Sequence, residues 1–291
     1  MRSMLALLSL LADLTKWKLS LFVALSAATG YLLADRTTPL EMVPMLLATF
    51  LLASGASGLN QYQERREDGL MERTKGRPIP SGRLSPEAGL LISILLLFFG
   101  SISLLLAATW KTFLLAMSAL FLYNAVYTPL KKRTLLAIVP GAWVGAIPPA
   151  MGWTSGGGGI EPQILALCTF LFLWQFPHTY FLLQSYRKDY LKAGFAPLLQ
   201  RGEDLLPEKV LWVWIMATVV SSLLIPFFGS DPSLWNLFVL TSLGLLLIYK
   251  TTRRLLFGVP RGSLRFAFRA VNLYMLSVLL LLNLDRIVRI G

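Results

Sequence analysis

The sequence lacks the charge density of a soluble protein and has almost no cysteine. Charged residues make up 14% of its 291 positions, whereas an ordinary soluble domain carries about 25%. This shortage argues against a soluble globular domain. The single cysteine, Cys168, excludes an intrachain disulfide. It lies in an apolar run, where we expect a small packing residue rather than a nucleophile.

Long apolar runs dominate what is present. Hydrophobic residues make up 55% of the chain, and the mean hydropathy is +0.64. A run of about 20 apolar residues crosses a bilayer core of about 30 Å as a helix. The runs are continuous rather than alternating, which disfavours a β-barrel. We therefore predict an all-α, polytopic membrane bundle that forms a single domain over residues 1–291.

Nine membrane spans are predicted, and the basic residues between them set their orientation. The spans are expected at residues 18–35, 39–59, 86–107, 110–129, 135–152, 161–183, 209–228, 234–250 and 266–284, after an amphipathic N-terminal segment at 1–17. Lys and Arg number 22 around the N-terminal segment and the loops after even-numbered spans, against 4 around the opposite connections and the C-terminus. This bias predicts a cytoplasmic N-terminus and an outside C-terminus in a bacterial inner membrane. It also explains the net charge of +12 without a nucleic-acid partner.

Two long cytoplasmic loops, 60–85 and 184–208, are expected to carry the active site. The first begins with NQYQERREDGLMERTKGRP, in which Asn60, Glu64, Glu67 and Asp68 have the spacing of one helical face and are expected to form a single stripe. Carboxylate and amide oxygens are ligands suited to Mg²⁺. Five cations accompany them: Arg65, Arg66, Arg73, Lys75 and Arg77. The alternative is a solvated helix whose acids, Glu72 among them, pair with basic residues.

The second long loop follows a span that ends in a polar cluster. Trp174, His178, Ser185 and Asp189 fall on one helical face, and Gln175 lies close to it. His178 is the only histidine of the chain, and an ionisable group in a membrane span is a functional candidate by default. The alternative is a structural hydrogen bond between helices. Polar clusters on one membrane side in spans two and six suggest one site shared between helices.

A third polar cluster ends the fourth span. Its members are Tyr123, Asn124 and Tyr127, followed by Lys131, Lys132 and Arg133. An aromatic belt followed by positive-inside charges accounts for the basic residues. It accounts less well for Asn124.

Four stretches resemble the protohaem IX farnesyltransferases (haem O synthases), a branch of the intramembrane UbiA prenyltransferase superfamily. They are NQYQERREDGLMERTKGRP (60–78), YTPLKKRT (127–134), PGAWVGAIPPAMGW (140–153) and WQFPHTYFLLQSYRKDYLKAGFAPLL (174–199). The resemblance covers roughly residues 14 to 200 in order and spacing, and the rest more loosely. It implies nine helices around a central cavity with a cytoplasmic mouth.

The resemblance also implies an activity. A farnesyl group would pass from farnesyl diphosphate to the 2-vinyl group of haem B, with water addition, to give haem O and diphosphate. The implied catalytic residues are Asn60, Glu64, Asp68, His178 and Asp189, of which the first three would hold Mg²⁺ as cofactor. The implied diphosphate-binding residues are Arg73, Lys75, Arg77, Lys132 and Arg133. The implied haem- or prenyl-binding residues are Tyr123, Asn124, Tyr127, Trp174, Gln175 and Tyr186. Besides both substrates and membrane lipid, the family suggests haem A synthase or terminal-oxidase assembly as partners.

Two departures from the family pattern bear on the metal. Glu64 stands where the family usually has Asp, and Arg66 replaces an acid, so the site could hold one or two Mg²⁺ ions. His178 replaces the first acid of the second motif in quinone-type relatives. It could ligate the haem iron, orient the haem or accept a proton, and we favour a role that faces the haem.

Two other functions are alternatives to this one. A prenyltransferase for an aromatic or quinone acceptor would favour acids near 178–189, where the chain offers only Asp189. A transporter would show an internal repeat of spans, and the acidic stripe after the second span has no equivalent in the second half of the sequence.

Overall fold

The computed structural model of this protein describes residues 2–34, 38–195, 208–229, 234–255 and 263–290. These ranges are mainly helical and contain no β-strand. The helices are α1 (Arg2–Thr15), α2 (Trp17–Ala34), α3 (Met42–Gln63), α4 (Arg65–Leu70), α5 (Pro86–Ala107), α6 (Trp110–Phe121), α7 (Thr128–Leu130), α8 (Ile138–Ser155), α9 (Pro162–Ser185), α10 (Arg187–Lys192), α11 (Glu208–Phe227), α12 (Leu234–Leu255) and α13 (Ser263–Ile290). Short 3₁₀ turns, η1 (Pro39–Glu41) and η3 (Leu135–Ala137), precede α3 and α8, and a π-helical segment, η2 (Leu122–Tyr127), follows α6.

Nine stretches of the described residues are long and apolar enough to cross a membrane. They are Trp17–Ala34, Pro39–Gln63, Pro86–Ala107, Trp110–Leu130, Leu135–Ser155, Pro162–Ser185, Lys209–Phe227, Leu234–Arg253 and Arg265–Arg289. Each one coincides with a predicted span, so the predicted membrane bundle is confirmed. The last stretch runs past the predicted end at 284, because Asp285 and Arg289 pair one turn apart at 3.1 Å and allow the helix to continue.

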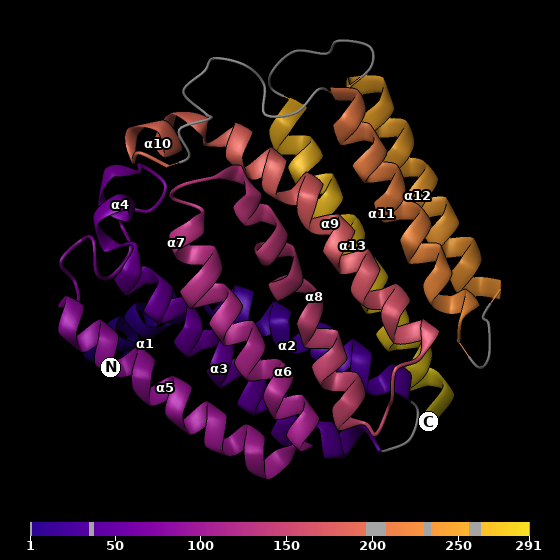
Figure 1. The fold of residues 1–291 in the computed structure, drawn as a ribbon, viewed down its shortest axis with the longest axis horizontal. Coiled ribbons are helices and arrows are strands. Elements are labelled where there is room, and N and C mark those ends of the chain that lie inside the picture. The colour runs from indigo at the N-terminus through magenta and orange to yellow at the C-terminus, as the bar shows by residue number, and fades with distance from the viewer. Residues whose placement is uncertain (1, 35–37, 196–207, 230–233, 256–262, 291) are drawn as a thin grey trace.

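The helices pack in two groups that meet along α2 and α8 (Figure 1). One apolar core joins α9 to α11, α12 and α13, and Phe170, Phe181 and Leu279 are fully buried in it. The other joins α3, α5 and α6 around Met45 and Leu104. Since α2 and α8 contribute side chains to both cores, they hold the two groups together.

Glycine allows α2 and α8 to approach closely. A Cβ on Gly152 of α8 would overlap the Ala27 carbonyl oxygen of α2, and a Cβ on Gly30 would overlap the Pro149 carbonyl oxygen in return. Small residues at a helix contact allow close backbone approach, which drives association in membranes through packing. Both helices also contribute residues to the lining of the central cavity.

The two predicted active-site loops begin with the same local structure. After α3, Glu64 leaves helical geometry (φ −108°, ψ 10°) and the chain resumes as the short helix α4. After α9, Tyr186 does the same (φ −118°, ψ 24°) before α10. Figure 1 shows α4 and α10 next to each other at one end of the bundle, where the Arg73 backbone N–H donates to Asp189 Oδ2 at 3.1 Å.

The N-terminal segment is a helix that packs on α3. Leu7 and Leu8 of α1 are more than half exposed, whereas Leu14 is buried. The Gln61 amide of α3 donates to the Asp13 and Leu14 carbonyls at 2.7 and 2.8 Å, which caps the end of α1. The next residue, Lys16, has a φ of 48°, a region that residues other than glycine seldom adopt. This turn directs Lys16 inward.

Candidate active site

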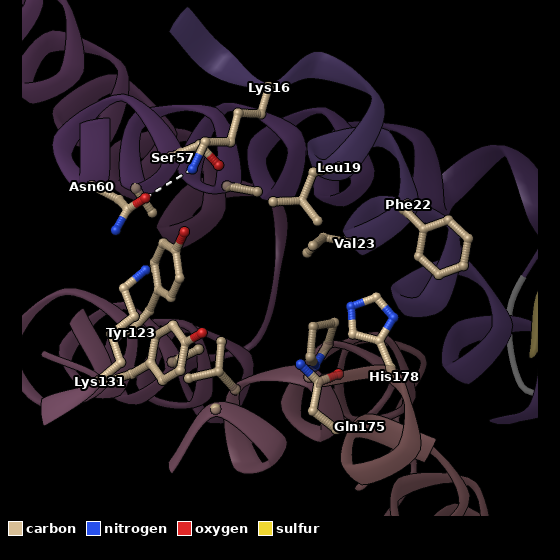
Figure 2. A pocket seen from close by; sticks show the side chains of 18 of the residues that line it. Lys16, Leu19, Phe22, Val23, Ser57, Asn60, Tyr123, Lys131, Gln175 and His178 are labelled. Carbon is tan, nitrogen blue, oxygen red and sulfur yellow. Dashed lines mark hydrogen bonds between the residues drawn. The ribbon is translucent and has the colours of Figure 1, made fainter. Parts of the chain in front are cut away.

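A cavity of about 440 Å³ lies inside the bundle and is lined mainly by residues of α2, α3, α4, α6, α8 and α9. One part of its wall is polar and comes from the α1–α2 junction, α3, α4 and the segment after η2. The other part carries Trp174, Gln175 and His178 of α9. Apolar side chains such as Leu19 and Val23 lie between them. Figure 2 shows Lys16, Asn60, Tyr123 and Lys131 on one side of this space and Gln175 and His178 on the other.

The predicted stripe of Asn60, Glu64 and Asp68 lines this cavity. The three residues are 1%, 3% and 1% exposed. Although α3 is interrupted at Glu64, the Glu64 N–H donates to the Asn60 carbonyl at 3.0 Å and the Asp68 N–H donates to the Glu64 carbonyl at 2.8 Å. These bonds preserve the four-residue spacing, so all three side chains stay on one face.

Each side chain of the stripe has a cationic partner. Lys16 Nζ donates to Asn60 Oδ1 at 2.8 Å, and the Asn60 amide donates to Thr128 Oγ1 at 3.0 Å. Lys131 Nζ lies 2.7 Å from a Glu64 carboxylate oxygen.

Arg77 Nη1 lies 2.6 Å from Asp68 Oδ2, while Asp68 Oδ1 is buried without a hydrogen-bond partner. Buried carboxylates need such partners, because an unpaired charge away from water is strongly unfavourable.

Burial and neighbouring charges shift the pKa of both lysines at this end of the cavity. Burial lowers the pKa of Lys16 to about 7, and the positive charges of Arg77 and Lys131 push it in the same direction. Burial also opposes the charged form of Lys131, but the neighbouring Tyr127 and Glu64 outweigh it and leave the pKa of Lys131 above its ordinary value. Lys131, Arg73 and Arg77 give this end of the cavity its positive charge, and an anion bound beside Lys16 would favour the charged form of that lysine as well.

The donor set of the stripe fits a hard cation such as Mg²⁺. Within the described ranges, no three histidine, cysteine or carboxylate side chains gather as a metal cluster. The stripe offers two carboxylates and one amide oxygen instead. Mg²⁺ is usually bound through one or two carboxylates together with substrate phosphates. Asp68 Oδ1 is buried and has no hydrogen-bond partner, which favours a bound cation next to this oxygen.

The predicted diphosphate-binding residues separate into two groups. Arg73 and Arg77 line the cavity. Arg73 is held by Tyr190, whose hydroxyl lies 3.5 Å from its guanidinium, and by the Tyr186 ring at 5.0 Å. Lys75 is exposed and pairs with Glu72 at 2.5 Å.

The basic residues after α7 divide in the same way. Lys131 lines the cavity, although a positive-inside charge was the only role predicted for it. Lys132 is directed to Glu67 at 2.6 Å, off the cavity wall, and Arg133 is exposed. One side chain of the three therefore reaches the site, because consecutive residues of a turn point in different directions.

The π-helical segment η2 brings two tyrosines to the cavity. The Tyr123 and Tyr127 rings stack with centroids 5.9 Å apart, and both residues line the cavity. A Cβ on Gly141 would lie 3.0 Å from the Tyr127 ring, so glycine leaves room for this side chain. Asn124 faces the other way and donates to the Ala56 carbonyl at 3.1 Å. Such π-turns are rare and frequently occur at functional sites.

The α9 end of the site is held by α13. Trp174 Nε1 donates to the Val271 carbonyl at 3.3 Å, and His178 Nδ1 lies 2.6 Å from Asn272 Oδ1. Trp174, Gln175 and His178 all line the cavity. Tyr186 and Asp189 do not line the cavity. The Tyr186 ring contacts the Arg73 guanidinium, and Asp189 accepts a hydrogen bond from the Arg73 backbone N–H.

Sequence reasoning gave no site role to Lys16, Lys131, Tyr190 and Asn272. Lys131 had a signal, since it follows Tyr127 by one helical turn. Lys16 forms a hydrogen bond with Asn60, which is 44 positions away in the chain. No local sequence pattern predicts such a contact.

Comparison with known proteins agrees with this geometry. Residues 21–276 match the UbiA prenyltransferase family. A protoheme IX farnesyltransferase of Oleidesulfovibrio alaskensis is 36% identical over 287 residues, which cover 96% of this chain and 97% of the relative.

Two solved structures share the fold. One, from work on digeranylgeranylglyceryl phosphate synthase in membranes, has a TM-score of 0.76 at 16% identity and covers 96% of this chain and 98% of that chain. The other, a UbiA homologue from Archaeoglobus fulgidus bound to GPP and Mg²⁺, has a TM-score of 0.63 at 17% identity and covers 94% of this chain and 99% of that chain. A helical membrane bundle, an acidic stripe at one end of its cavity and a family match over most of its length lead to one conclusion: this chain belongs to the UbiA prenyltransferase family.

Proposed function

We propose that this protein transfers a farnesyl group from farnesyl diphosphate to the 2-vinyl group of haem B, giving haem O and diphosphate. The observation that carries the proposal is that one cavity joins the Asn60–Glu64–Asp68 stripe and its cations to His178. One end suits a diphosphate, and the other presents the only imidazole of the chain. The protohaem IX farnesyltransferase relative supports the choice of substrates.

The cationic end acts on the leaving group. Farnesyl transfer breaks the bond between C1 of the farnesyl group and a diphosphate oxygen, and negative charge grows on the diphosphate. Lys16, Arg73, Arg77 and Lys131 line this end of the cavity, which supports a role for them in stabilising the charge on the diphosphate. Fixed cations in a water-poor site stabilise such charge more strongly than they would in water. Lys75, Lys132 and Arg133 would then contribute only to the field at the cytoplasmic edge.

We assign Asn60, Glu64 and Asp68 as the residues that would hold Mg²⁺. When bound, Mg²⁺ supplies Lewis-acid stabilisation of the departing diphosphate. The A. fulgidus homologue was solved with GPP and Mg²⁺, which supports a metal at this end. The stripe lies deep enough that its carboxylates meet substrate rather than bulk water.

The rest of the cavity protects and receives the farnesyl group. Apolar side chains such as Leu19, Phe22 and Val23 shield the allylic cation from early capture by water. The vinyl π-electrons of haem B form the new C–C bond at C1, and the positive charge moves to the neighbouring vinyl carbon. One water then adds its oxygen there and loses a proton, which gives the hydroxyfarnesyl substituent. His178 and Trp174 face the haem in this arrangement.

The protein is an integral membrane protein, and we assign it to a bacterial inner membrane. The basic residues around the α4 and α10 end favour a cytoplasmic orientation for the cavity mouth. The N-terminus then lies in the cytoplasm and the C-terminus outside. A haem A synthase or a terminal-oxidase assembly factor is the natural recipient of haem O.

Co-expression with a source of farnesyl diphosphate tests the proposal. We expect extracted haem to increase in mass by one hydroxyfarnesyl group. His178→Ala should abolish this product while the protein still inserts, and Asp68→Ala should abolish Mg²⁺-dependent diphosphate release.

Glu72→Ala is the matched control, because this acid lies on the same loop but is exposed and, among the described residues, pairs with Lys75 and Lys192. If Asp68→Ala forms haem O at the wild-type level, the stripe has a structural role and no catalytic one. A wild-type protein that farnesylates an aromatic acceptor but not haem would overturn the substrate assignment.

A further inference from the structure

Asn272 is a polar side chain inside α13 that no sequence pattern indicated. Its Oδ1 lies 2.6 Å from His178 Nδ1, and Asn272 does not line the cavity. One position earlier, the Val271 carbonyl accepts the bond from Trp174. Since Trp174 and His178 are one turn apart on α9, two polar contacts join α9 to α13 directly behind the α9 wall of the cavity.

Aromatic rings hold the imidazole from two further sides. The Trp174 ring centroid lies 4.6 Å from that of His178, and the Phe268 ring centroid lies 5.2 Å away. Phe268 and Asn272 are themselves one turn apart on α13. The His178 ring is therefore enclosed by two residues of α13 and one of α9, and its orientation is set by packing as well as by the hydrogen bond.

The contact with Asn272 determines which ring nitrogen carries the proton. An amide oxygen only accepts hydrogen bonds, so Nδ1 must donate to it. A neutral imidazole has one N–H and one lone pair, which leaves the lone pair on Nε2. Figure 2 shows a His178 ring nitrogen directed into the cavity, and Nδ1 is engaged on the side away from it. The cavity thus meets a lone pair rather than an N–H donor.

We propose that Asn272 is a positioning residue that holds His178 so that Nε2 coordinates the iron of the haem substrate. The inference rests on the proposed function, because it takes haem as the ligand of this end of the cavity. Histidines that bind metals generally donate their other ring N–H to an acceptor, which fixes the tautomer and increases ligand basicity. Asn272 supplies this acceptor. The same arrangement argues against His178 orienting haem by donating a hydrogen bond from Nε2.

Haem binding by the purified full-length protein tests the role of Asn272. Ferric haem B is titrated into wild type, Asn272→Leu and Asn272→Asp, and the Soret band and the affinity are recorded. We expect a histidine-type band in wild type that His178→Ala removes. Asn272→Leu should weaken haem binding by roughly 10–100-fold, the usual effect of losing such a partner, and should shift the band.

Asn272→Asp should keep the wild-type band, because a carboxylate also accepts from Nδ1. Asn283→Leu is the matched control: Asn283 is a buried asparagine of the same helix, about three turns further on, and its loss should leave the band unchanged. If leucine prevents folding at 272, Asn272→Ala takes its place, with thermal unfolding recorded alongside.

Two outcomes would overturn the inference. One is an Asn272→Leu protein with the wild-type band and affinity. The other is an Asn272→Asp protein that behaves like Asn272→Leu, since this would mean that the amide donates to Nδ1 and Nε2 carries the proton. In either case the proposed function stands if wild type still forms haem O on co-expression. A wild type that forms no farnesylated haem overturns both.

Discussion

Replacing Lys131 with methionine should destabilise the protein, because it leaves a buried carboxylate without its cation. The Glu64 side chain is 4% exposed and lies 2.7 Å from Lys131 Nζ. Removing one partner of a buried ion pair costs about 3–5 kcal/mol. Since the Lys131 side chain is 22% exposed, water already screens part of the pair, and we expect a loss of about 3 kcal/mol.

Equilibrium unfolding in mixed micelles measures this loss. Lys131→Met should unfold at a lower fraction of denaturing detergent than wild type. The double variant Lys131→Met/Glu64→Gln has no unpaired buried carboxylate at position 64. It should recover most of the free energy of unfolding that Lys131→Met loses. It should still fail to release diphosphate, because both side chains belong to the proposed site.

Lys132→Met serves as the control for this experiment. Its partner Glu67 is 23% exposed, and a pair at that exposure contributes about 0–1 kcal/mol. A Lys131→Met protein as stable as wild type, or a double variant as unstable as the single one, would refute the reasoning, since either result means that Glu64 does not depend on Lys131.

Two further substitutions test the diphosphate end and the helix crossing. Lys16→Met should weaken farnesyl diphosphate binding by roughly 10–100-fold, because a charged hydrogen bond contributes about 1.5–3 kcal/mol. Lys18 is exposed, so Lys18→Met should bind farnesyl diphosphate like wild type in an equilibrium binding assay. Equal affinities of the two variants would show that Lys16 does not belong to the site. Gly152→Ala should lower the free energy of unfolding by about 1–3 kcal/mol, because its Cβ meets the Ala27 carbonyl oxygen. Gly69→Ala, where a Cβ meets open space, should unfold like wild type, and similar curves for the two variants would contradict the close crossing.

The membrane fold could be predicted from the sequence because its signals are local. Apolar runs set the spans, and the balance of Lys and Arg set the predicted orientation. The stripe of Asn60, Glu64 and Asp68 was also readable, since helical spacing survives the interruption of α3 at Glu64. The prediction of a UbiA-type prenyltransferase was confirmed by the family match and the shared fold.

Other site assignments depended on the orientation of side chains, which the sequence does not specify. Asn124 lies between two cavity tyrosines, yet the π-helical turn directs it to the Ala56 carbonyl. Lys131 and Lys132 are adjacent, but they reach Glu64 and Glu67 respectively. Neither outcome follows from residue type, because a turn of the chain determines which of two neighbours meets the cavity.

The sequence by itself determined the helical membrane class, the positions of the spans and the polar motifs that end them. Those properties follow from hydrophobicity and from spacing along one helix, which neighbouring residues carry. Only the tertiary structure decided that Lys16 meets Asn60 and that Asn272 meets His178. Both contacts join helices far apart in the chain, and they depend on how α1, α3, α9 and α13 pack, which is a property of the whole bundle.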